Sequence, residues 1–236
     1  MNIAENYQNI QTKIAEACIR GGRSPHEVKL IVVTKNQPAW KINQVIQSGA
    51  RRLGENYPEQ LAQKIAEIDQ TKKPEWHMIG HLQRRKIKYI IEYFSMMHSI
   101  EDLDTAEKLN RACTAAGIRM PICIEVNIAG ETSKFGIDAS EKEKWGSIAE
   151  FVLKIGEMDQ LIPVGLMTMP PYVEQGELNR KYFQKCRLLL EYIKQETHLP
   201  DFHELSMGTS SDFETAIEEG ATFVRIGEAI MGSREN

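Results

Sequence analysis

The sequence predicts an α/β protein, built as a single (β/α)8 TIM barrel with an extra N-terminal helix. Eight short strand-like segments, of which the first (residues 28–35) is an apolar β-branched run, alternate with longer segments in which apolar residues recur at helical spacing. The composition shows no break along the 236 residues, so we assign residues 1–236 to one domain. Strands that alternate with helices run parallel, and eight of them favour a closed barrel.

The first half of the chain contains the extra helix and four strand–helix units. The helix is predicted from an apolar stripe, and Gly21-Gly22 ends it; the stripe is Ile3, Tyr7, Ile10, Ile14 and Ala17 with Cys18. Strands are predicted at residues 28–35, 52–55, 75–80 and 95–100, the first of them from an apolar β-branched run. Helical spacing predicts helices at residues 38–47, 58–68, 82–91 and 101–116. Pro38 suits the first turn of its helix, and Gly117 suits the end of the fourth.

The second half repeats the pattern. Strands are predicted at residues 120–128, 161–168, 202–207 and 223–226, and helices at residues 140–155, 176–198 and 210–219. An open doubly wound sheet is the structural alternative. That fold has fewer strands and a glycine-rich first turn, whereas the turn after the first strand reads Thr34-Lys35-Asn36-Gln37-Pro38.

Composition excludes several classes of function. The net charge of −4 argues against a general nucleic-acid surface, and the basic run at residues 84–88 is interpreted as a solvated helix face. No apolar run is long enough to span a membrane. The four cysteines have spacings typical of neither a metal site nor a disulfide framework, which predicts reduced thiols in the cytoplasm. The outer helices show no additional apolar stripe, which predicts a monomer.

Unusual polar residues gather where the predicted strands end. In a barrel these carboxyl ends converge on one face, which is where barrel active sites lie. Lys35 ends the first strand, after Leu30-Ile31-Val32-Val33, so its stem is expected to emerge from the barrel wall. Desolvation there favours the neutral amine, which attacks carbonyls and forms Schiff bases. An ion pair with a carboxylate at the barrel mouth, such as Glu55, is the equally open alternative.

A phosphate site is indicated after the last two strands. Gly208-Thr209-Ser210-Ser211-Asp212 places small hydroxyl residues at the start of a helix, where the helix dipole favours an anion. An ordinary cap by Ser210 or Ser211 is the alternative. At the end of the last strand, Arg225 adds a guanidinium, and Gly227 lets the backbone approach a ligand closely. Because the first and last strands pair in a closed barrel, Lys35 and both loops are expected to border one ligand, and pyridoxal 5′-phosphate carries both an aldehyde and a phosphate.

The ordered motifs resemble the YggS/PROSC family of pyridoxal-phosphate-binding proteins over nearly the whole chain. Those that carry the resemblance are Val33-Thr34-Lys35-Asn36-Gln37-Pro38, Gly54-Glu55-Asn56-Tyr57, Trp76-His77-Met78-Ile79-Gly80-His81-Leu82-Gln83, Glu125-Val126-Asn127, Phe135-Gly136, Gly165-Leu166-Met167, Leu205-Ser206-Met207-Gly208 with Ser210 and Asp212, and Val224-Arg225-Ile226-Gly227. Thr209 and Arg85 depart from the family pattern. Thr209 offers a further hydroxyl to the phosphate, and Arg85 is expected to face solvent.

The resemblance implies a barrel akin to the N-terminal domain of alanine racemase, with pyridoxal phosphate held as a Schiff base on Lys35. It implies further cofactor-binding residues, namely Asn56, His81, Met167, Ser206, Gly208, Thr209, Ser210, Arg225 and Gly227. Ser206 is our candidate for the group that faces the pyridine nitrogen. The family is associated with vitamin B6 homeostasis, so pyridoxal-phosphate-dependent apoenzymes are the expected protein partners.

Three functions remain open on the sequence. The first is a pyridoxal phosphate carrier without catalytic residues, because no clear second proton-transfer group accompanies Lys35. The second is a racemase of low activity, for which His81 is the best internal candidate. The third is a Schiff-base aldolase acting on sugar phosphates, which the motif set disfavours.

Overall fold

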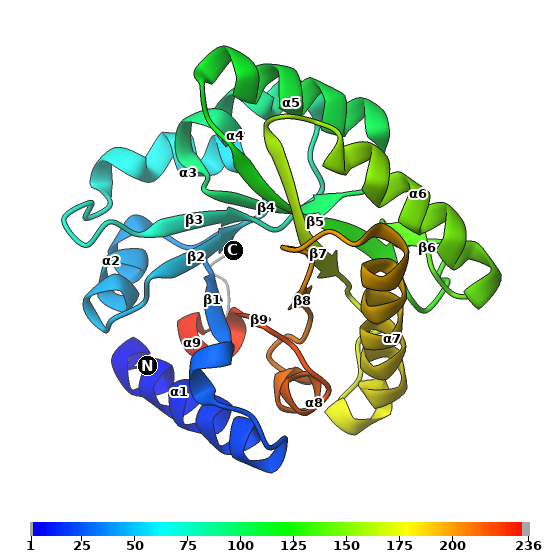
Figure 1. Ribbon diagram of the computed structural model, residues 1–236. Helices are drawn as coiled ribbons and strands as arrows, with labels where there is room; N and C mark the ends of the chain where they lie inside the picture. The colour runs from blue at the N-terminus through cyan, green and yellow to red at the C-terminus, as the bar shows by residue number, and fades with distance from the viewer. Residues whose placement is uncertain (1, 233–236) are drawn as a thin grey trace.

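The computed structural model, which describes residues 2–232, closes the predicted barrel (Figure 1). Within those residues eight parallel strands follow one another in the order β4-β3-β2-β1-β9-β8-β7-β5, and β4 pairs with β5 to complete the ring. The strands of the ring are β1 (Lys29–Val33), β2 (Arg52–Glu55), β3 (Glu75–Met78), β4 (Met96–Ile100), β5 (Met120–Asn127), β7 (Leu161–Met167), β8 (Glu204–Ser206) and β9 (Phe223–Ile226).

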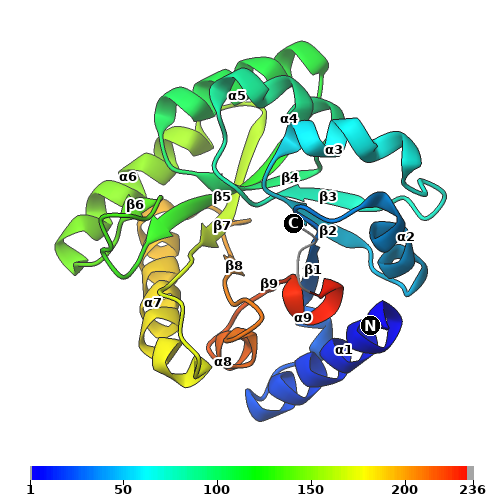
Figure 2. The ribbon, with the colours of Figure 1, turned by 180° about the vertical axis from the view of Figure 1, so that it is seen from behind.

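Helices surround the ring on all sides (Figures 1 and 2). They are α1 (Ile3–Arg20), α2 (Ala39–Gln47), α3 (Pro58–Lys64), α4 (Ile87–Tyr93), α5 (Leu103–Ala116), α6 (Trp145–Gly156), α7 (Arg180–Thr197), α8 (Phe213–Glu218) and α9 (Glu228–Met231). Short 3-10 helices cover Pro25–Glu27, Ile65–Glu67, Arg84–Lys86, Lys142–Lys144 and Gly176–Asn179. The predicted barrel with an additional N-terminal helix is confirmed. The two-residue β6 (Ile137–Asp138), which pairs with β5, and the final α9 were not predicted.

The N-terminal helix α1 completes the outer layer beside the first and last strands. Asn2 caps it by accepting from the backbone of Ala4 and Glu5, and all six residues of its predicted apolar stripe are buried. The helix packs against α2, α8 and α9. Arg20 fixes it to α8 through Glu214 and Glu218, each at 2.7 Å. The extra helix therefore covers the part of the ring where the chain begins and ends.

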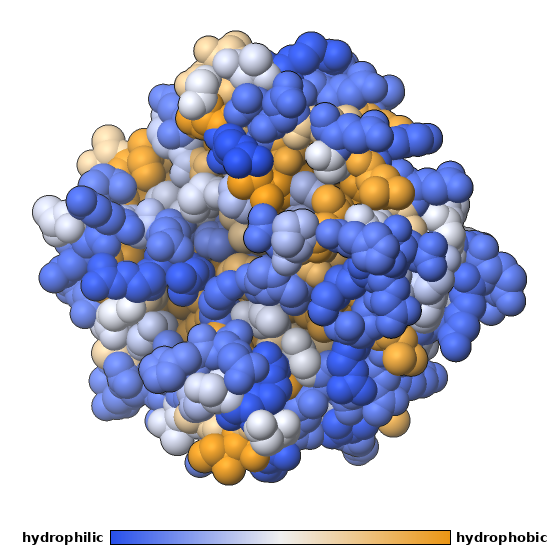
Figure 3. Space-filling view, in the orientation of Figure 1, coloured by the Kyte–Doolittle hydropathy of each residue, from blue (hydrophilic) through white to orange (hydrophobic). Residues whose placement is uncertain are grey.

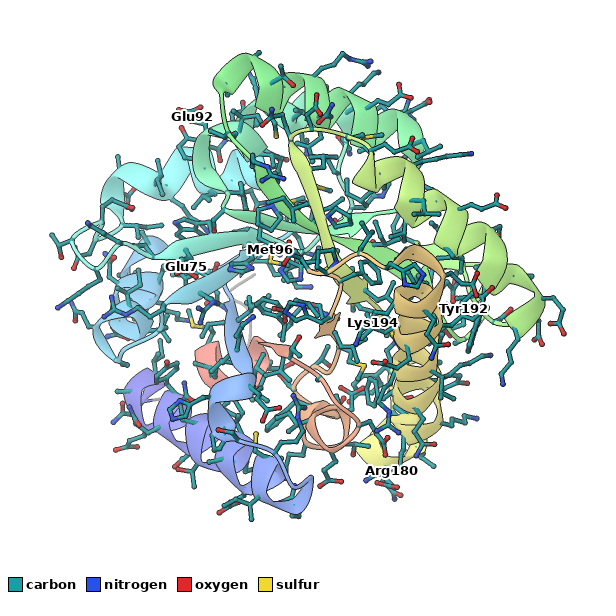
Figure 4. The ribbon with its side chains drawn as sticks, viewed as in Figure 1. Glu75, Glu92, Met96, Arg180, Tyr192 and Lys194 are labelled. Atoms are coloured by element: carbon teal, nitrogen blue, oxygen red, sulfur yellow. The ribbon has the colours of Figure 1, made fainter. Side chains whose placement is uncertain are left out.

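The apolar core has two parts. The larger part lies between the strands and the surrounding helices. A small cluster lies inside the ring and consists of Ile31, Met96, Cys123, Met167 and Phe223. Figure 4 shows Met96 near the middle of the barrel, whereas Arg180, Tyr192 and Lys194 lie along the outer helix α7. Apolar side chains thus pack inside the ring, as in other folds of this class.

The two ends of the barrel differ. Helix α9 follows the carboxyl end of β9 and lies in front of β1 in Figure 2, so Figure 2 looks onto the carboxyl ends of the strands. Figure 3 shows the opposite end, where hydrophilic side chains cover most of the surface. No helix within residues 2–232 combines the length and apolar character that crossing a membrane requires.

Close contact between β7 and β8 depends on Gly165, which lies in register with Glu204. A Cβ atom at position 165 would overlap the backbone carbonyl oxygen of Glu204. We therefore expect Gly165→Ala to lower the free energy of unfolding by about 3 kcal/mol, because the two strands would have to separate. Urea unfolding monitored by circular dichroism measures this loss.

Gly146→Ala is the matched control, since a Cβ at this helical position would have the Tyr192 hydroxyl oxygen as its nearest neighbour, at 3.8 Å. We expect this variant to be neutral or more stable by up to about 1 kcal/mol. Equal unfolding free energies for Gly165→Ala and the native chain would contradict the tight β7–β8 packing.

Candidate functional site

A cavity of about 490 Å³ opens at the carboxyl ends of the strands. Its volume lies within the range of small-molecule sites, roughly 300–1,000 Å³. Two of the described residues that line it belong to strands, Val33 of β1 and Arg225 of β9. The others follow β1, β2, β3, β7, β8 and β9, and they are Lys35, Asn56, Ile79, Met169, Tyr172, Thr209, Ser210, Ser211, Gly227, Glu228 and Ala229. Segments far apart in the sequence therefore meet at one site because the ring is closed.

Six of the ten residues that the sequence proposes as a binding site line this cavity: Lys35, Asn56, Thr209, Ser210, Arg225 and Gly227. Ser206 lies beneath Arg225, and the carbonyl of Gly208 accepts from the backbone N–H of Arg225 at 3.0 Å. Met167 is 1% exposed in the barrel interior. These three residues form no part of the cavity wall in the described structure.

His81 lies apart from the cavity wall, although it directly follows the strand predicted at residues 75–80. In the structure β3 ends at Met78, so His81 lies three residues beyond it. Its ring is exposed and stacks on Phe135 with the ring centroids 4.3 Å apart. Its Nδ1 lies 2.8 Å from Oε1 of Glu101. The residue after a strand points inward or outward according to the loop conformation, and here the loop turns His81 toward the segment that precedes β6. Arg85 is exposed, as predicted.

Several cavity residues were missed by the sequence reasoning. Val33 is the last residue of β1, and Ile79 directly follows β3. Because side chains alternate between the two faces of a strand, Val33 faces the same way as Lys35 two residues later, and this alternation would have identified it. Met169 and Tyr172 lie in the connection between β7 and α7, and both are exposed. Nothing in the local sequence Met169-Pro170-Pro171-Tyr172 indicates which of these side chains faces the cavity.

The loop that carries Lys35 is held by a buried acid. Lys35 lies two residues beyond the end of β1 and is half-buried. The Thr34 hydroxyl donates to Oε1 of Glu55 at 2.8 Å, and the Thr34 N–H donates to the carbonyl of Gly54 at 2.9 Å. Asn36 adopts a positive φ of 58°, which turns the chain toward α2. The backbone on both sides of Lys35 is thereby fixed to β2.

Lys64 of α3 completes this attachment. Its Nζ donates to Oε1 of Glu55 at 2.6 Å and to the carbonyl oxygens of Thr34 and Gln37, at 3.5 and 3.3 Å. Burial raises the pKa of the Glu55 carboxyl, and the Lys64 ammonium opposes that rise. The sequence left open whether Glu55 pairs with Lys35. In the structure Glu55 forms an ion pair with Lys64. Lys64 also donates to backbone carbonyls on both sides of Lys35 in the sequence.

The loop after β8 forms the opposite side of the cavity. Gly208 has a φ of 92°, and a Cβ there would come within 2.6 Å of the Ala216 side chain. The backbone N–H and hydroxyl of Thr209 donate to Oδ1 of Asp212 at 2.7 and 3.1 Å. Asp212, rather than Ser210 or Ser211, is the N-cap residue of α8. The two serines thus line the cavity without capping the helix, while the Thr209 hydroxyl turns toward Asp212.

Arg225 is the fixed cation of the cavity wall. It is 4% exposed, and its Nη1 donates to Oγ of Ser206 at 2.7 Å while its Nη2 donates to the carbonyl of Thr168 at 3.0 Å. A buried guanidinium keeps its charge and can only donate hydrogen bonds. The site therefore combines an amine, a permanent cation and two serine hydroxyls around one cavity, which suits a small anionic ligand that carries a carbonyl group.

Glu125 lies in the same inward-facing layer, next to Met167 in register. It is 9% exposed. The pKa of its carboxyl is raised to about 7, chiefly by burial and also by the neighbouring Glu101 carboxylate, against the opposing effect of Arg225. Glu125 therefore changes charge near neutral pH, close to the Arg225 guanidinium.

Known proteins resemble the chain over its full length. A family model described as "Alanine racemase, N-terminal domain" matches residues 2–235. A protein of Aquifex aeolicus named "Pyridoxal phosphate homeostasis protein" is 36% identical over 235 residues, covering 100% of both chains. A protein of the same name from Escherichia coli K12 is 35% identical, covering 99% of this chain and 97% of its own.

A solved structure has the same fold as the chain. It is PipY of Synechococcus elongatus PCC7942 with PLP bound, which superimposes with a TM-score of 0.80 at 29% sequence identity. The match covers 93% of this chain and 100% of PipY. Both the sequence and the structural similarity therefore extend over nearly the whole barrel.

The Lys64–Glu55 pair predicts a large effect of a single substitution. Lys64→Met leaves the buried Glu55 carboxylate without its cation, and we expect a loss of about 3 kcal/mol in the free energy of unfolding. The double variant Lys64→Met/Glu55→Gln is expected to recover at least half of this loss, because a neutral amide needs no counter-charge. Urea unfolding compares the three proteins, and a Lys64→Met chain as stable as the native one would exclude a structural role for the pair.

Glu125 predicts a pH-dependent stability. Its carboxyl has a pKa of about 7 in the folded chain, whereas an unperturbed glutamate has a pKa of about 4.3. The folded state therefore holds a proton that the unfolded state has released, and the stability that this proton contributes is lost as the pH rises from about 4.3 through about 7. Relative to Glu125→Gln, the native chain should lose about 2–3 kcal/mol between about pH 5 and about pH 8.

Urea unfolding of the ligand-free proteins at both pH values measures this difference. Glu143→Gln, at an exposed position before α6, is the control and should follow the native pH profile. Parallel profiles for native chain and Glu125→Gln would show that Glu125 ionises normally.

Proposed function

The chain belongs to the family of the alanine racemase N-terminal domain, and from that premise we propose that it binds pyridoxal 5′-phosphate and acts in pyridoxal phosphate homeostasis. Its full-length relatives carry the name of that function, and PipY holds PLP in the same fold. The observation that carries the proposal is that Lys35, Arg225 and Ser210 line one cavity. An aldehyde-reactive amine and groups that attract a phosphate are thus available to the same ligand.

The residues of the cavity fit the cofactor. The volume of about 490 Å³ accommodates a small aromatic ring with its phosphate arm. Val33 and Ile79 supply apolar wall for the ring, and Ser210 and Ser211 supply hydroxyl donors for the phosphate. Gly227 on the neighbouring loop lets the backbone approach the ligand closely. Amine, apolar wall and anion-binding loops correspond to the aldehyde, ring and phosphate of pyridoxal phosphate.

Lys35 holds the cofactor in this proposal. Its ε-amino nitrogen forms the Schiff base with the aldehyde carbon, and the aldehyde oxygen leaves as water. The Glu55–Lys64 pair holds the backbone of Thr34 and Gln37, so the Lys35 side chain extends from a fixed backbone. Bound pyridoxal phosphate would supply an electron sink. The side chains that face the ring determine how strongly the cofactor withdraws electrons.

Arg225, rather than Ser206, is the side chain that we assign to the ring on the inner wall. The Ser206 hydroxyl is fully buried and lies behind the guanidinium. A guanidinium donates and does not accept a proton, so it cannot keep a pyridine nitrogen protonated as a carboxylate would. This arrangement weakens carbanion chemistry and favours holding the cofactor over racemase chemistry.

We also propose that the protein exchanges the cofactor with other proteins. Met169 and Tyr172 line the cavity and are 48% and 83% exposed, so the ligand lies close to solvent. A Schiff base hydrolyses reversibly, which suits release to pyridoxal-phosphate-dependent apoenzymes. The four cysteines are buried and free, which suits a reducing compartment such as the cytoplasm.

Lys35→Ala tests the function. We expect it to weaken pyridoxal phosphate binding by about 100-fold or more, because the covalent link is lost and only the non-covalent contacts remain. Equilibrium titration of the ligand-free protein measures the dissociation constant. Lys88→Ala, which removes an exposed lysine of α4, is the matched control and should bind as the native chain does. Native affinity in Lys35→Ala would refute the Schiff-base assignment.

Ser210→Ala tests the phosphate end of the cavity. We expect about a 10-fold loss of affinity for pyridoxal phosphate, since a hydrogen bond to a charged group is removed. Affinity for pyridoxal, which has no phosphate, should change by less than about 2-fold. An equal loss for both ligands would show that Ser210 does not contact the phosphate.

A further inference from the structure

A continuous chain of buried polar side chains runs through the barrel interior to the cavity wall. The Arg225 guanidinium donates to the Ser206 hydroxyl at 2.7 Å, and the Ser206 oxygen lies 2.9 Å from Nδ1 of His98. On the other side of the same ring, Nε2 of His98 lies 2.9 Å from Nδ1 of His77. All four side chains are at most 4% exposed. Barrel interiors are usually filled by branched apolar side chains, so this chain needs an explanation.

The Arg225 end fixes the direction of every hydrogen bond. A guanidinium has only donors, so the Ser206 oxygen accepts from it. The Ser206 hydroxyl proton then needs an acceptor of its own, and Nδ1 of His98 lies in hydrogen-bond range. If Nδ1 carried a proton instead, the Ser206 oxygen would accept twice and a fully buried hydroxyl proton would lack a partner among the described residues, which is unfavourable.

The histidines have the protonation states that this direction requires. Burial lowers the pKa of His98 well below its usual value, and His77 and Arg225 lower it further. Burial, together with the charges of Arg52 and Lys29, likewise lowers the pKa of His77 to about 3. Both rings are therefore neutral, and each carries one N–H. With Nδ1 of His98 accepting, its N–H lies on Nε2 and donates to His77.

Aromatic packing fixes the two rings in place. Phe223 lies edge-on to His98 with the ring centroids 5.2 Å apart, and it also packs against His77 at 5.8 Å. Phe223 belongs to β9, two residues before Arg225, so the strand that presents the guanidinium also supports the imidazoles. His98 on β4 is thereby linked to Arg225 across the interior of the ring.

We propose that His98 is a positioning residue: it accepts the Ser206 hydroxyl proton and so holds the Arg225 guanidinium in the orientation that the bound ligand meets. This inference rests on the proposed function for the identity of the ligand. His98 itself does not line the cavity in the described structure and acts only through Ser206. His77 extends the chain by accepting from His98, which secures the tautomer.

Nuclear magnetic resonance of the ligand-free protein, labelled with 15N-histidine, tests the direction of these hydrogen bonds without any cofactor. Long-range nitrogen–proton correlations identify which ring nitrogen carries the proton. We expect neutral His98 and His77, both protonated at Nε2, from about pH 8 down to about pH 5. A His98 protonated at Nδ1, or a His98 imidazolium in this range, would overturn the proposal, even if pyridoxal phosphate binds as proposed.

Substitutions at His98 test the effect on the site. His98→Asn places a side-chain oxygen near the position of Nδ1 and retains an acceptor for Ser206, whereas His98→Leu has none. We expect His98→Leu and Ser206→Ala each to weaken pyridoxal phosphate binding about 10-fold and to shift the absorption maximum of the bound cofactor. His98→Asn should stay within about 3-fold of the native affinity and keep the native absorption maximum.

The double variant His98→Leu/Ser206→Ala shows whether the two residues act as one unit. We expect a total loss of about 10-fold, no larger than that of either single variant, because both remove the same support from Arg225. If the double variant instead lost about 100-fold in affinity, the product of the two single losses, the proposal would be overturned. Native affinity and native absorption in Ser206→Ala would overturn it as well. If His98→Leu does not fold, Ser206→Ala and His98→Asn still give opposite expected results. A native chain that binds no pyridoxal phosphate would refute the proposed function, while the tautomer of His98 would still be decided by magnetic resonance.

Discussion

The pairing of β1 with β9 is the contact on which the site depends. Ile31 lies in register with Arg225, so closing the ring brings the first and last strands together along their whole length. Lys35 follows β1 and Gly227 follows β9, and both border the same cavity only because these strands are neighbours. An open sheet would leave the amine and the last loop at opposite edges. Helix α1 reinforces the closure from outside by packing on α8 and α9.

Buried polar groups support the cavity on two sides, from outside the ring on one side and from inside it on the other. On the Lys35 side, the Glu55–Lys64 pair holds the backbone from outside the ring. On the Arg225 side, the chain from Ser206 to His77 holds the guanidinium from inside the ring. One arrangement fixes the backbone beside Lys35 and the other fixes the Arg225 side chain, and both do so through residues that do not line the cavity in the described structure. Buried polar groups of this kind are costly unless every partner is present, so they also make the site sensitive to substitutions at a distance.

The fold could be predicted from the sequence because short strand-like segments alternate with helical ones, and each crossover returns the chain to the same end. Loop residues such as Lys35, Ser210 and Gly227 could be placed at one face for the same reason. The orientation of side chains after a strand could not be predicted, and His81 shows why: its direction depends on the conformation of the loop. The partner of Glu55 depends on the position of α3. His98 carries no local signal, since its role depends on residues 108 and 127 positions away that meet it only in the closed barrel.

Reduction of the native protein with borohydride tests the central claim most directly. The account predicts a visible absorption band from bound pyridoxal phosphate that disappears on reduction, and a stable mass increase confined to the peptide that contains Lys35. A protein that neither contains nor takes up pyridoxal phosphate, or a mass increase on a different lysine, would contradict it.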